Sequence, residues 1–434
     1  MNEVCLRHLK PELHEYLKIG GYTVWKKLLL GQLSAEEVLE EIKLSNLRGR
    51  GGAGFLTGLK WGFMNREDPK LRYLICNSDE GEPGTCKDTL ILRYNPHQLL
   101  EGIAICAYVI GANTAYNYIR GEYHREFVQC EKALEEARNE GLLGENILNS
   151  GFDLQIHNIL GAGSYIVGEE TAMMESIEGK RAMPRSKPPF PAQSGLWGMG
   201  TTINNTETLA SIPIIVEKGG QWFRSLGVEQ SSGMKIFCVS GHVRKPGVFE
   251  LKMGTPFSEL VERCGGIRFN RDIKAVIPGG TSMRVLPASS LINLTMDYDA
   301  IERAGSNLGS GGVIIMDEHT CMVKVLTHLM RFYHHESCGQ CTPCREGSGW
   351  IYGMLLQIMN NEGNAEMVGK IREIAKKIEG RTICAFGEAM SWPVTSFIDH
   401  FYDEFVYFSR HGKSMVVKQA EAFSFDVHLS RNND

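Results

Sequence analysis

Four cysteines near the C-terminus have the spacing of a metal-binding motif. Cys338, Cys341 and Cys344 form a C-x2-C-x2-C triplet, and Cys384 follows 40 residues later. Three thiolates at this spacing bind three corners of a cubane cluster, and a remote fourth completes the ligand set. A zinc site also uses four cysteines, but zinc modules usually present two separated C-x2-C pairs. The pattern therefore favours one 4Fe-4S cluster.

A glycine-rich segment near the N-terminus suggests a binding loop. It reads G-x-G-x-x-G over Gly49, Arg50, Gly51, Gly52, Ala53 and Gly54. Residues 42–46 read as a helix end, so the strand that precedes a dinucleotide fingerprint is missing. The glycines nevertheless allow a sharp turn close to a ligand, and a helix predicted over 57–64 would attract an anion, with Arg50 and Lys60 adding positive charge. A flexible linker is the alternative, but a linker would lack the flanking Phe55 and Lys60.

Acids and amides recur where predicted strands end. Asn77, Asp79, Glu80 and Glu82 follow a strand predicted over 72–76, and a glycine-rich segment at 161–170 joins a strand predicted over 152–157 to a helix that opens near Glu169. Ligands of α/β folds bind at this edge of the sheet. A divalent-metal loop, a solvated acidic turn and simple helix capping remain the alternatives. The repetition predicts one ligand that touches all these segments.

The elements that position these residues fall into successive regions. Strands and helices alternate between residues 71 and 179, which predicts a parallel sheet covered on both faces. A small α+β unit follows, and the last 110 or so residues hold four helical patterns that predict a four-helix bundle. The first and third loops of such a bundle share one end, which would bring Cys384 beside the triplet. The expected divisions are an N-terminal helical segment (1–44), an α/β domain (45–233), an α+β domain (234–318), the bundle (319–420) and a tail (421–434).

Composition excludes several classes of protein. The 434 residues carry a formal net charge of -5, which disfavours a nucleic-acid binder. The longest apolar run, residues 99–112, spans only about 21 Å as a helix, too short to cross a bilayer. The N-terminus lacks the apolar stretch of a signal peptide, so we expect a cytoplasmic protein with reduced thiols. The other eight of its 12 cysteines fall mostly on strand or helix patterns and are expected to be core residues.

Six segments together resemble the NADH-oxidising flavoprotein subunits of respiratory complex I, known as 51 kDa subunits. The resemblance runs in unbroken order from about residue 45 to 400. The six segments are RGRGGAGFLTGLKW (48–61), NSDEGEPGTCKD (77–88), GAGSYIVGEETA (161–172), PRSKPPFPAQSGLWG (184–198), TTINNTETLAS (201–211) and SCGQCTPCREG (337–347).

The resemblance implies one FMN, one 4Fe-4S cluster and NADH as substrate, and a ubiquitin-like, soluble-ligand-binding β-grasp fold for the middle unit. The glycine loop with Lys60 would hold the flavin phosphate. The residues that would line the flavin are Asn77, Asp79, Glu80, Tyr165, Gly168, Glu169, Asn204, Asn205 and Thr208. Those that would contact NADH are Phe55, Phe63, Glu82, Glu170, Lys187 and Phe190. The acids among them would disfavour the extra phosphate of NADPH.

The family also implies a mechanism and partners. Hydride transfer is carried by the cofactors, so no catalytic side chain is expected. Electrons would leave to a 2Fe-2S subunit of the 24 kDa type and a large iron–sulfur subunit, with membrane contact only through the complex, on the cytoplasmic side of the inner membrane. A diaphorase subunit of an NAD-linked hydrogenase or formate dehydrogenase is the nearest alternative. A zinc-stabilised scaffold or nucleotide sensor is a non-enzymatic one, and it would be colourless.

Overall fold

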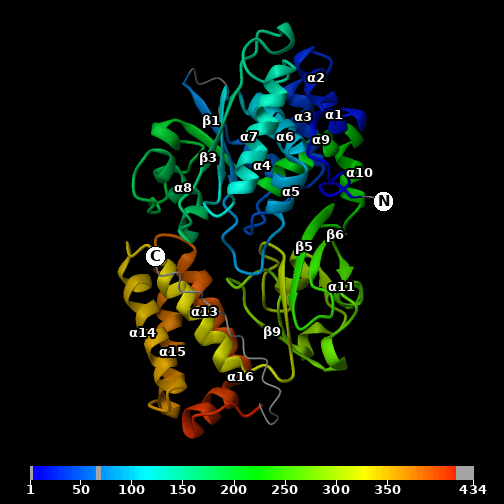
Figure 1. Cartoon of the computed structure of the whole chain (residues 1–434). Helices are drawn as coiled ribbons and strands as arrows, with labels where there is room; N and C mark the ends of the chain where they lie inside the picture. The colour runs from blue at the N-terminus through cyan, green and yellow to red at the C-terminus, as the bar shows by residue number, and fades with distance from the viewer. Residues whose placement is uncertain (1–2, 65–69, 417–434) are drawn as a thin grey trace, which may run out of the picture.

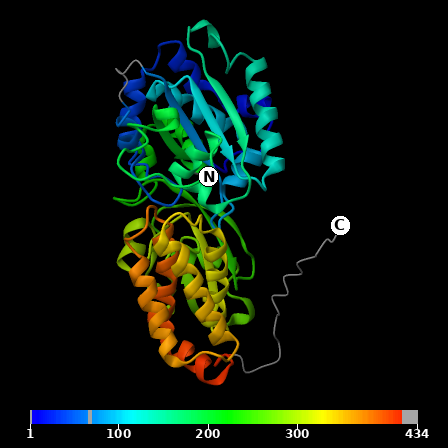
Figure 2. The same ribbon diagram turned by 90° about the vertical axis from the view of Figure 1, so that its left-hand side faces the viewer.

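The computed structural model describes residues 3–64 and 70–416. An α/β region (3–225) lies at the top of the molecule, and a middle region (234–317) and a helical region (322–411) lie side by side beneath it (Figure 1). Figure 2 shows the helical region in front of the middle region, with both directly below the α/β region. The three regions therefore meet at one junction.

The α/β region is built on a four-stranded sheet of order β3-β2-β1-β4, in which every pairing is parallel. Its strands are β1 (Arg72–Ser78), β2 (Thr114–Ile119), β3 (Gln155–Leu160) and β4 (Gly200–Asn205). The parallel sheet is thus confirmed. The strand predicted over 152–157 is observed three residues later, as β3. Leu154 forms an isolated bridge with Gly144, and pairing with β2 begins at Gln155. All four strands end at the edge that faces the junction.

Helices surround this sheet, and α6 lies at their centre. They are α1 (Leu13–Lys18), α2 (Thr23–Leu29), α3 (Ala35–Leu44), α4 (Thr57–Gly62), α5 (Asp88–Tyr94), α6 (Pro96–Ile110), α7 (His124–Asn139), α8 (Glu170–Ile177), α9 (Thr206–Lys218) and α10 (Gly220–Ser225), with short 3-10 turns at η1 (Ile147–Asn149), η2 (Tyr165–Gly168) and η3 (Leu196–Gly198). A Cβ at Gly102 of α6 would lie 2.0 Å from the carbonyl oxygen of Leu209, so glycine lets α6 pack directly on α9. The longest apolar run is therefore a core helix. No helix in the described part of the chain is long and apolar enough to cross a membrane.

The middle region is an α+β unit around a five-stranded sheet of order β6-β5-β11-β8-β9. Its elements are β5 (Met234–Gly241), β6 (Gly247–Lys252), β7 (Thr255–Pro256), α11 (Phe257–Arg263), η4 (Arg268–Asn270), β8 (Ile273–Ile277), β9 (Leu286–Pro287), η5 (Ala288–Leu291), β10 (Thr295–Met296), α12 (Tyr298–Arg303) and β11 (Gly312–Asp317). The N-terminal segment is fastened to this region, because the carboxylate of Glu250 on β6 accepts hydrogen bonds from the amides of Val4, Cys5 and Leu6 at 2.8–3.1 Å.

The helical region consists of four helices that pack on one another. They are α13 (Met322–Glu336), α14 (Thr342–Met359), α15 (Ala365–Ile378) and α16 (Phe386–His411). One buried residue from each of these four helices, namely Leu326, Ile351, Ile371 and Val394, enters a common apolar core that also contains Ile166 of the α/β region. The loops that precede α14 and α16 face the junction. The predicted tail, 421–434, lies outside the described residues.

Candidate functional site

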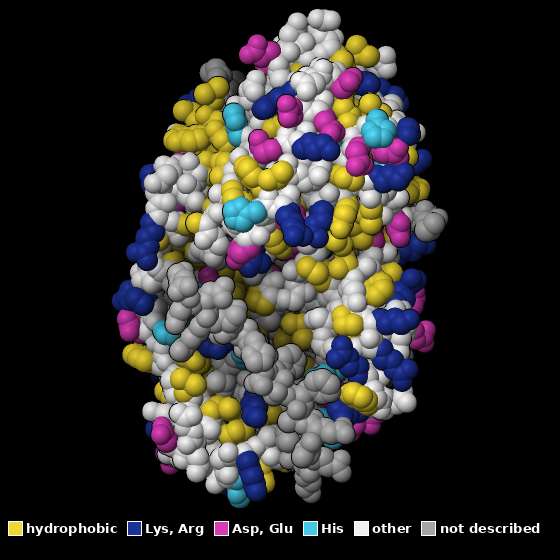
Figure 3. All heavy atoms as spheres, viewed as in Figure 1, with side chains coloured by type: hydrophobic (Ala, Val, Ile, Leu, Met, Phe, Trp, Pro, Cys, Tyr) yellow, Lys and Arg dark blue, Asp and Glu magenta, His cyan; other side chains and the backbone are white. Residues whose placement is uncertain are grey.

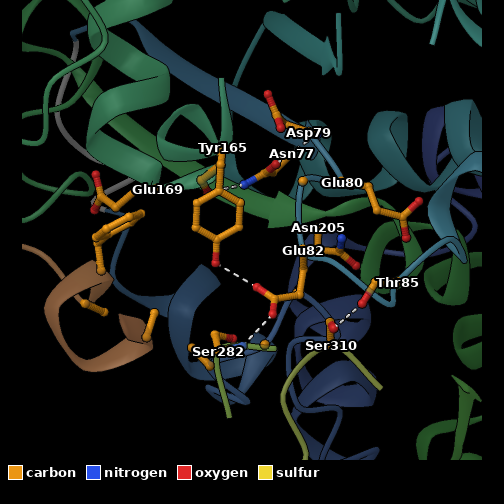
Figure 4. Close-up of a pocket in the computed structure, with 18 of the residues that line it drawn as sticks. Asn77, Asp79, Glu80, Glu82, Thr85, Tyr165, Glu169, Asn205, Ser282 and Ser310 are labelled. Atoms are coloured by element: carbon orange, nitrogen blue, oxygen red, sulfur yellow. Dashed lines mark hydrogen bonds between the residues drawn. The ribbon is translucent and has the colours of Figure 1, made fainter. Parts of the chain in front are cut away.

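A cavity of about 500 Å³ lies where the three regions meet (Figure 4). Its lining residues from the α/β region are Gly51, Gly52, Ala53, Asn77, Asp79, Glu80, Gly81, Glu82, Thr85, Lys87, Asp88, Tyr165, Ile166, Gly168, Glu169 and Asn205. The middle region adds Ser282, Met283, Asn307 and Ser310, and the helical region adds Ala385, Phe386, Glu388, Ala389 and Trp392. Its size is that of a cofactor or small-molecule site. Residues from most of the predicted binding motifs thus face one space.

The glycine loop forms one wall of the cavity. The loop closes on itself, because the amide of Gly49 donates to the carbonyl oxygen of Phe55 at 2.8 Å. Gly54 has a φ of +65°, and a Cβ there would lie 2.8 Å from the ring of Tyr298. Gly52 has a φ of +134° and faces open space. Glycine is therefore required for the shape of this loop and for its approach to a ligand.

The Arg50 side chain turns away from the cavity. It is only 1% exposed, and its Nη2 donates to the carbonyl oxygens of Ser232 at 2.8 Å and Met234 at 2.9 Å. We expected its charge to face an anion, but the guanidinium instead joins the α/β region to the start of β5. The backbone amide of Arg50 donates to Thr208 Oγ1 at 2.8 Å, so Thr208 supports the loop from behind.

The carboxylate of Glu82 accepts hydrogen bonds from two regions of the protein (Figure 4). Tyr165 Oη donates to it at 2.7 Å, and the amide of Ser282 donates at 2.8 Å. Thr281 Oγ1 also donates to Glu82, at 3.3 Å, and is itself bonded to Tyr333 Oη at 3.0 Å. Burial raises the pKa of Glu82, and these hydrogen bonds partly offset that shift. All three regions thus hold one carboxylate in place.

Asp79 and Glu80 have different surroundings. Burial raises the pKa of Asp79 to about 7, so this cavity-lining carboxyl releases its proton near neutral pH. Burial also raises the pKa of Glu80 to about 7, but its carboxylate accepts from the amides of Lys87, Asp88 and Thr89. Glu80 therefore satisfies the first turn of α5 in addition to lining the cavity.

The predicted amide side chains divide into two groups. Asn77 lines the cavity and donates to the carbonyl oxygen of Gly168 at 2.9 Å, and Asn205 lines it while accepting from the amide of Glu207 at the start of α9. Asn204 is buried behind the wall, where its Oδ1 accepts from Trp61 Nε1 at 2.9 Å. Asn204 and Thr208 thus shape the wall rather than line it.

The capping alternative holds for Glu169 without excluding it from the site. Its carboxylate accepts from the amides of Thr171 and Ala172 at 2.9 Å and so caps α8, while the residue still lines the cavity. The adjacent Glu170 binds Lys187 Nζ at 2.5 Å and Lys60 Nζ at 3.3 Å. Burial raises the pKa of Glu170, but the two lysines outweigh burial and hold it below its usual value.

Three exposed aromatic rings lie in or directly after the predicted binding motifs. Phe55 and Phe63 are 50% and 60% exposed, and their ring centroids are 6.0 Å apart. Phe190 is 55% exposed. Rings that keep half their surface in water offer flat apolar faces to a second ring.

The four predicted cysteines line a second, small cavity that shares lining residues with the large one. Its walls are Ile166, Ser337, Cys338, Gln340, Cys341, Cys344, Thr382, Cys384, Phe386 and Gly387. Among residues 3–64 and 70–416, no three His, Cys, Asp or Glu side chains are arranged to hold a single metal ion, and the thiols line a space instead of meeting at a point. Four thiols without a lining carboxylate suit an iron–sulfur cluster. Burial raises the pKa of the free thiols of Cys344 and Cys384 to about 11 and about 12, so iron must displace their protons.

Ile166 and Phe386 line both cavities. Sequence reasoning did not single out either residue, nor Lys87, Ser282 or Ser310. Lys87 is the exception that carried a signal, because it lies inside the acidic motif. Ile166 also lies inside a motif, the glycine-rich segment 161–172, where it reads as an ordinary apolar residue. Ser282, Ser310 and Phe386 stand outside the binding motifs and reach the cavity only through the packing of the regions.

Comparison with known proteins identifies the family. The description "Nuo51 FMN-binding domain" matches residues 42–214, "SLBB domain" matches 236–286, and "NADH-ubiquinone oxidoreductase-F iron-sulfur binding region" matches 324–407. The F subunit of NADH-quinone oxidoreductase from Rickettsia bellii is 49% identical over 395 residues, which cover 91% of this chain and 94% of that protein. The chain belongs to the family of NADH-quinone oxidoreductase F subunits. An F subunit of Rhizobium meliloti, numbered 2, is 51% identical over 395 residues, 91% of this chain and 93% of that protein.

A solved relative of this F-subunit chain comes from another kind of enzyme. A chain of an NAD+-reducing [NiFe]-hydrogenase, crystallised in the H2-reduced state, has a TM-score of 0.82 and 33% sequence identity. The match covers 91% of this chain and 66% of the hydrogenase chain, so the F-subunit chain spans about two thirds of that relative's length.

Proposed function

We propose that this chain oxidises NADH by hydride transfer to FMN bound in the large cavity, and that electrons then leave singly through a 4Fe-4S cluster held by Cys338, Cys341, Cys344 and Cys384. The observation that carries the proposal is that Ile166 and Phe386 line both cavities. A two-electron acceptor and a one-electron carrier bound there would be separated only by this apolar wall. When bound, FMN supplies the hydride acceptor and the cluster supplies the one-electron relay.

The side chains of this protein would bind and orient the flavin and NADH. We infer that the glycine loop (49–54) and Lys60 hold the flavin phosphate, while Asn77, Asp79, Glu80, Tyr165, Gly168, Glu169 and Asn205 line the flavin and Asn204 and Thr208 support it. Glu82 and Glu170 would accept hydrogen bonds from the amide and hydroxyl groups of NADH, and Phe55, Phe63 and Phe190 would stack on its rings beside Lys187. The extra phosphate that distinguishes NADPH from NADH would be repelled near Glu170, so we expect NADH to be preferred over NADPH. Replacing Glu170 with Gln should raise the relative use of NADPH.

The finer architecture and the partners also belong to this proposal. We assign the middle region as a β-grasp domain (234–318), supported by β5 starting at Met234 and β11 ending at Asp317, and the last region as a four-helix bundle (319–420). These follow an N-terminal segment (1–44) and the FMN domain (45–233). The partners would be the 2Fe-2S subunit of the 24 kDa type and the large iron–sulfur subunit of complex I, its E and G subunits. The chain would lie on the cytoplasmic side of the inner membrane, with quinone as final acceptor.

A diaphorase role in an NAD-linked hydrogenase is the second candidate, favoured by the hydrogenase likeness. Purification from its natural source separates the two. Copurification with quinone-reducing subunits supports complex I, whereas copurification with a [NiFe] subunit contradicts it.

The spectrum of the reconstituted protein tests the cofactor assignment. Under anaerobic conditions we expect flavin bands with a broad iron–sulfur shoulder, both bleached by NADH. Cys384→Ala should lose the shoulder and keep the flavin, whereas Cys321→Ala, at a buried cysteine directly before α13, should keep both. A protein that holds neither flavin nor iron would overturn the proposal.

A further inference from the structure

Two cysteines outside the cluster motif face each other across the junction of the α/β and middle regions. Of the eight cysteines outside the motif, Cys86 is exposed and the other seven are buried. Cys238, on β5, is one of the seven. The backbone amide of Cys86 donates to Cys238 Sγ at 3.2 Å. The buried sulfur of Cys238 is therefore in contact with the backbone of Cys86.

Neighbouring contacts hold the two cysteines in place from both sides. Thr85 Oγ1 lies 2.5 Å from Ser310 Oγ, and Gly84 packs so closely on Gly312 that a Cβ at Gly312 would lie 2.8 Å from the Gly84 carbonyl carbon. Gly312 in turn pairs with Cys238 in the β11–β5 ladder.

On the other side of Cys86, Lys87 Nζ is buried between Asp88 at 2.7 Å and Glu207 at 3.0 Å. The segments that carry the two cysteines are therefore already packed against each other.

The chemistry of the pair is asymmetric. The hydrogen bond between the two thiols lowers the pKa of Cys86 and, together with burial, raises the pKa of Cys238. Cys86 is therefore the more reactive of the two towards an oxidant, because it is both exposed and more readily ionised. Cys238 is shielded from solvent but lies close to any oxidised sulfur that forms on Cys86.

We propose that Cys86 and Cys238 are a reversible dithiol–disulfide pair, oxidised by hydroperoxides, whose disulfide ties the cavity-lining segment 79–88 to β5. With hydrogen peroxide, Cys86 Sγ attacks one oxygen and the O–O bond breaks; that oxygen stays on sulfur as a sulfenic acid, and the other takes up the Cys86 proton and leaves as water. Cys238 Sγ then attacks the Cys86 sulfur, the S–S bond forms, and the S–O bond breaks to release a second water that takes the Cys238 proton. The two thiols lose two electrons and the peroxide gains two. This inference does not depend on the proposed function.

Peptide mapping of the oxidised holoenzyme tests the proposal. The full-length protein, purified without oxygen, is treated with a small excess of hydrogen peroxide while its visible spectrum shows that the cofactors stay bound. We expect a Cys86–Cys238 cross-linked peptide that dithiothreitol removes. Hydrogen exchange of amides 79–88 should slow by about threefold or more in the oxidised form, because a tether suppresses local opening.

Variants distinguish a pair of cysteines that forms a disulfide from a single exposed thiol that is oxidised alone. Cys238→Ser should abolish the cross-link and leave a Cys86 sulfenic acid that dimedone labels, and Cys86→Ser should abolish both products. Cys264→Ala, a buried cysteine of the same region, should leave the cross-link unchanged. Peroxide that labels Cys86 without a cross-link in the parent protein, or that joins Cys86 to a different cysteine, would overturn the proposal.

Discussion

The ring of Phe386 lies edge-on to the ring of Tyr165, with 5.8 Å between their centroids, in the wall shared by the two cavities. Replacing Phe386 with Ala should remove that wall and cost about 3–5 kcal/mol of stability. Because water would then reach the cysteine-lined cavity, the iron–sulfur absorbance should decay faster in air. The control is Phe397→Ala, an equally buried ring of α16 away from the wall. Similar decay rates in two folded variants would contradict this role of Phe386.

The hydroxyl of Tyr165 fixes the carboxylate of Glu82 at 2.7 Å. Tyr165→Phe leaves a buried carboxylate oxygen without its donor, a change worth about 1–3 kcal/mol. The KM for NADH should therefore rise by roughly five- to hundredfold, measured as NADH oxidation with an artificial electron acceptor. Tyr333→Phe removes a hydroxyl that bonds Thr281, one step away from Glu82, so its effect should be smaller. A Tyr165→Phe variant with an unchanged KM would disprove this link.

Arg50 joins two regions and does not face the cavity. A lysine keeps the charge but cannot donate to the carbonyl oxygens of Ser232 and Met234 through a planar guanidinium. We expect Arg50→Lys to lower the melting temperature by several degrees, with a loss of about 1–3 kcal/mol, while the Kd for FMN changes little. Thermal unfolding and flavin fluorescence titration measure the two effects. A large loss of flavin affinity at unchanged melting temperature would instead place the charge of Arg50 at the ligand.

Glu250 predicts a pH dependence of stability. Burial raises its pKa from 4.5 to about 7, so between these values the native state keeps a proton that the unfolded chain has released. Its contribution to stability is therefore fully present below pH 4.5 and declines as the pH rises to 7. Glu250→Gln cannot ionise, so its melting temperature relative to the parent protein should rise from pH 5 to pH 8. A melting temperature of Glu250→Gln that runs parallel to that of the parent protein from pH 5 to pH 8 would contradict the assignment.

Sequence reasoning predicted the parts of the structure that depend on local patterns of residues. The apolar spacing along α13 to α16 predicted four helices, and the two loops at one end brought Cys384 to the triplet's cavity. Acids and glycines beyond β1 and β3 predicted the edge of the sheet where the cavity lies. Each of these signals spans fewer than about 20 residues.

Long-range contacts could not be predicted in the same way. The position of Arg50 in a glycine motif suggested an anion as its partner. Its guanidinium instead donates to backbone carbonyls 182 and 184 residues away. A backbone acceptor leaves no side-chain pattern in the sequence. Ser282 and Ser310 reach the cavity because the middle region packs below the sheet. Phe386 looks like any apolar residue at the start of a helix, and only the position of that helix makes it part of the wall.

Charged side chains of both signs are spread over the described surface on the face seen in Figure 3. Near the start of the described chain, the amides of Val4, Cys5 and Leu6 depend on Glu250, which lies about 245 positions further along the chain. A ribosome releases residues 4–6 long before it has made the strand that receives them. This short segment must therefore wait, unattached, until Glu250 has emerged.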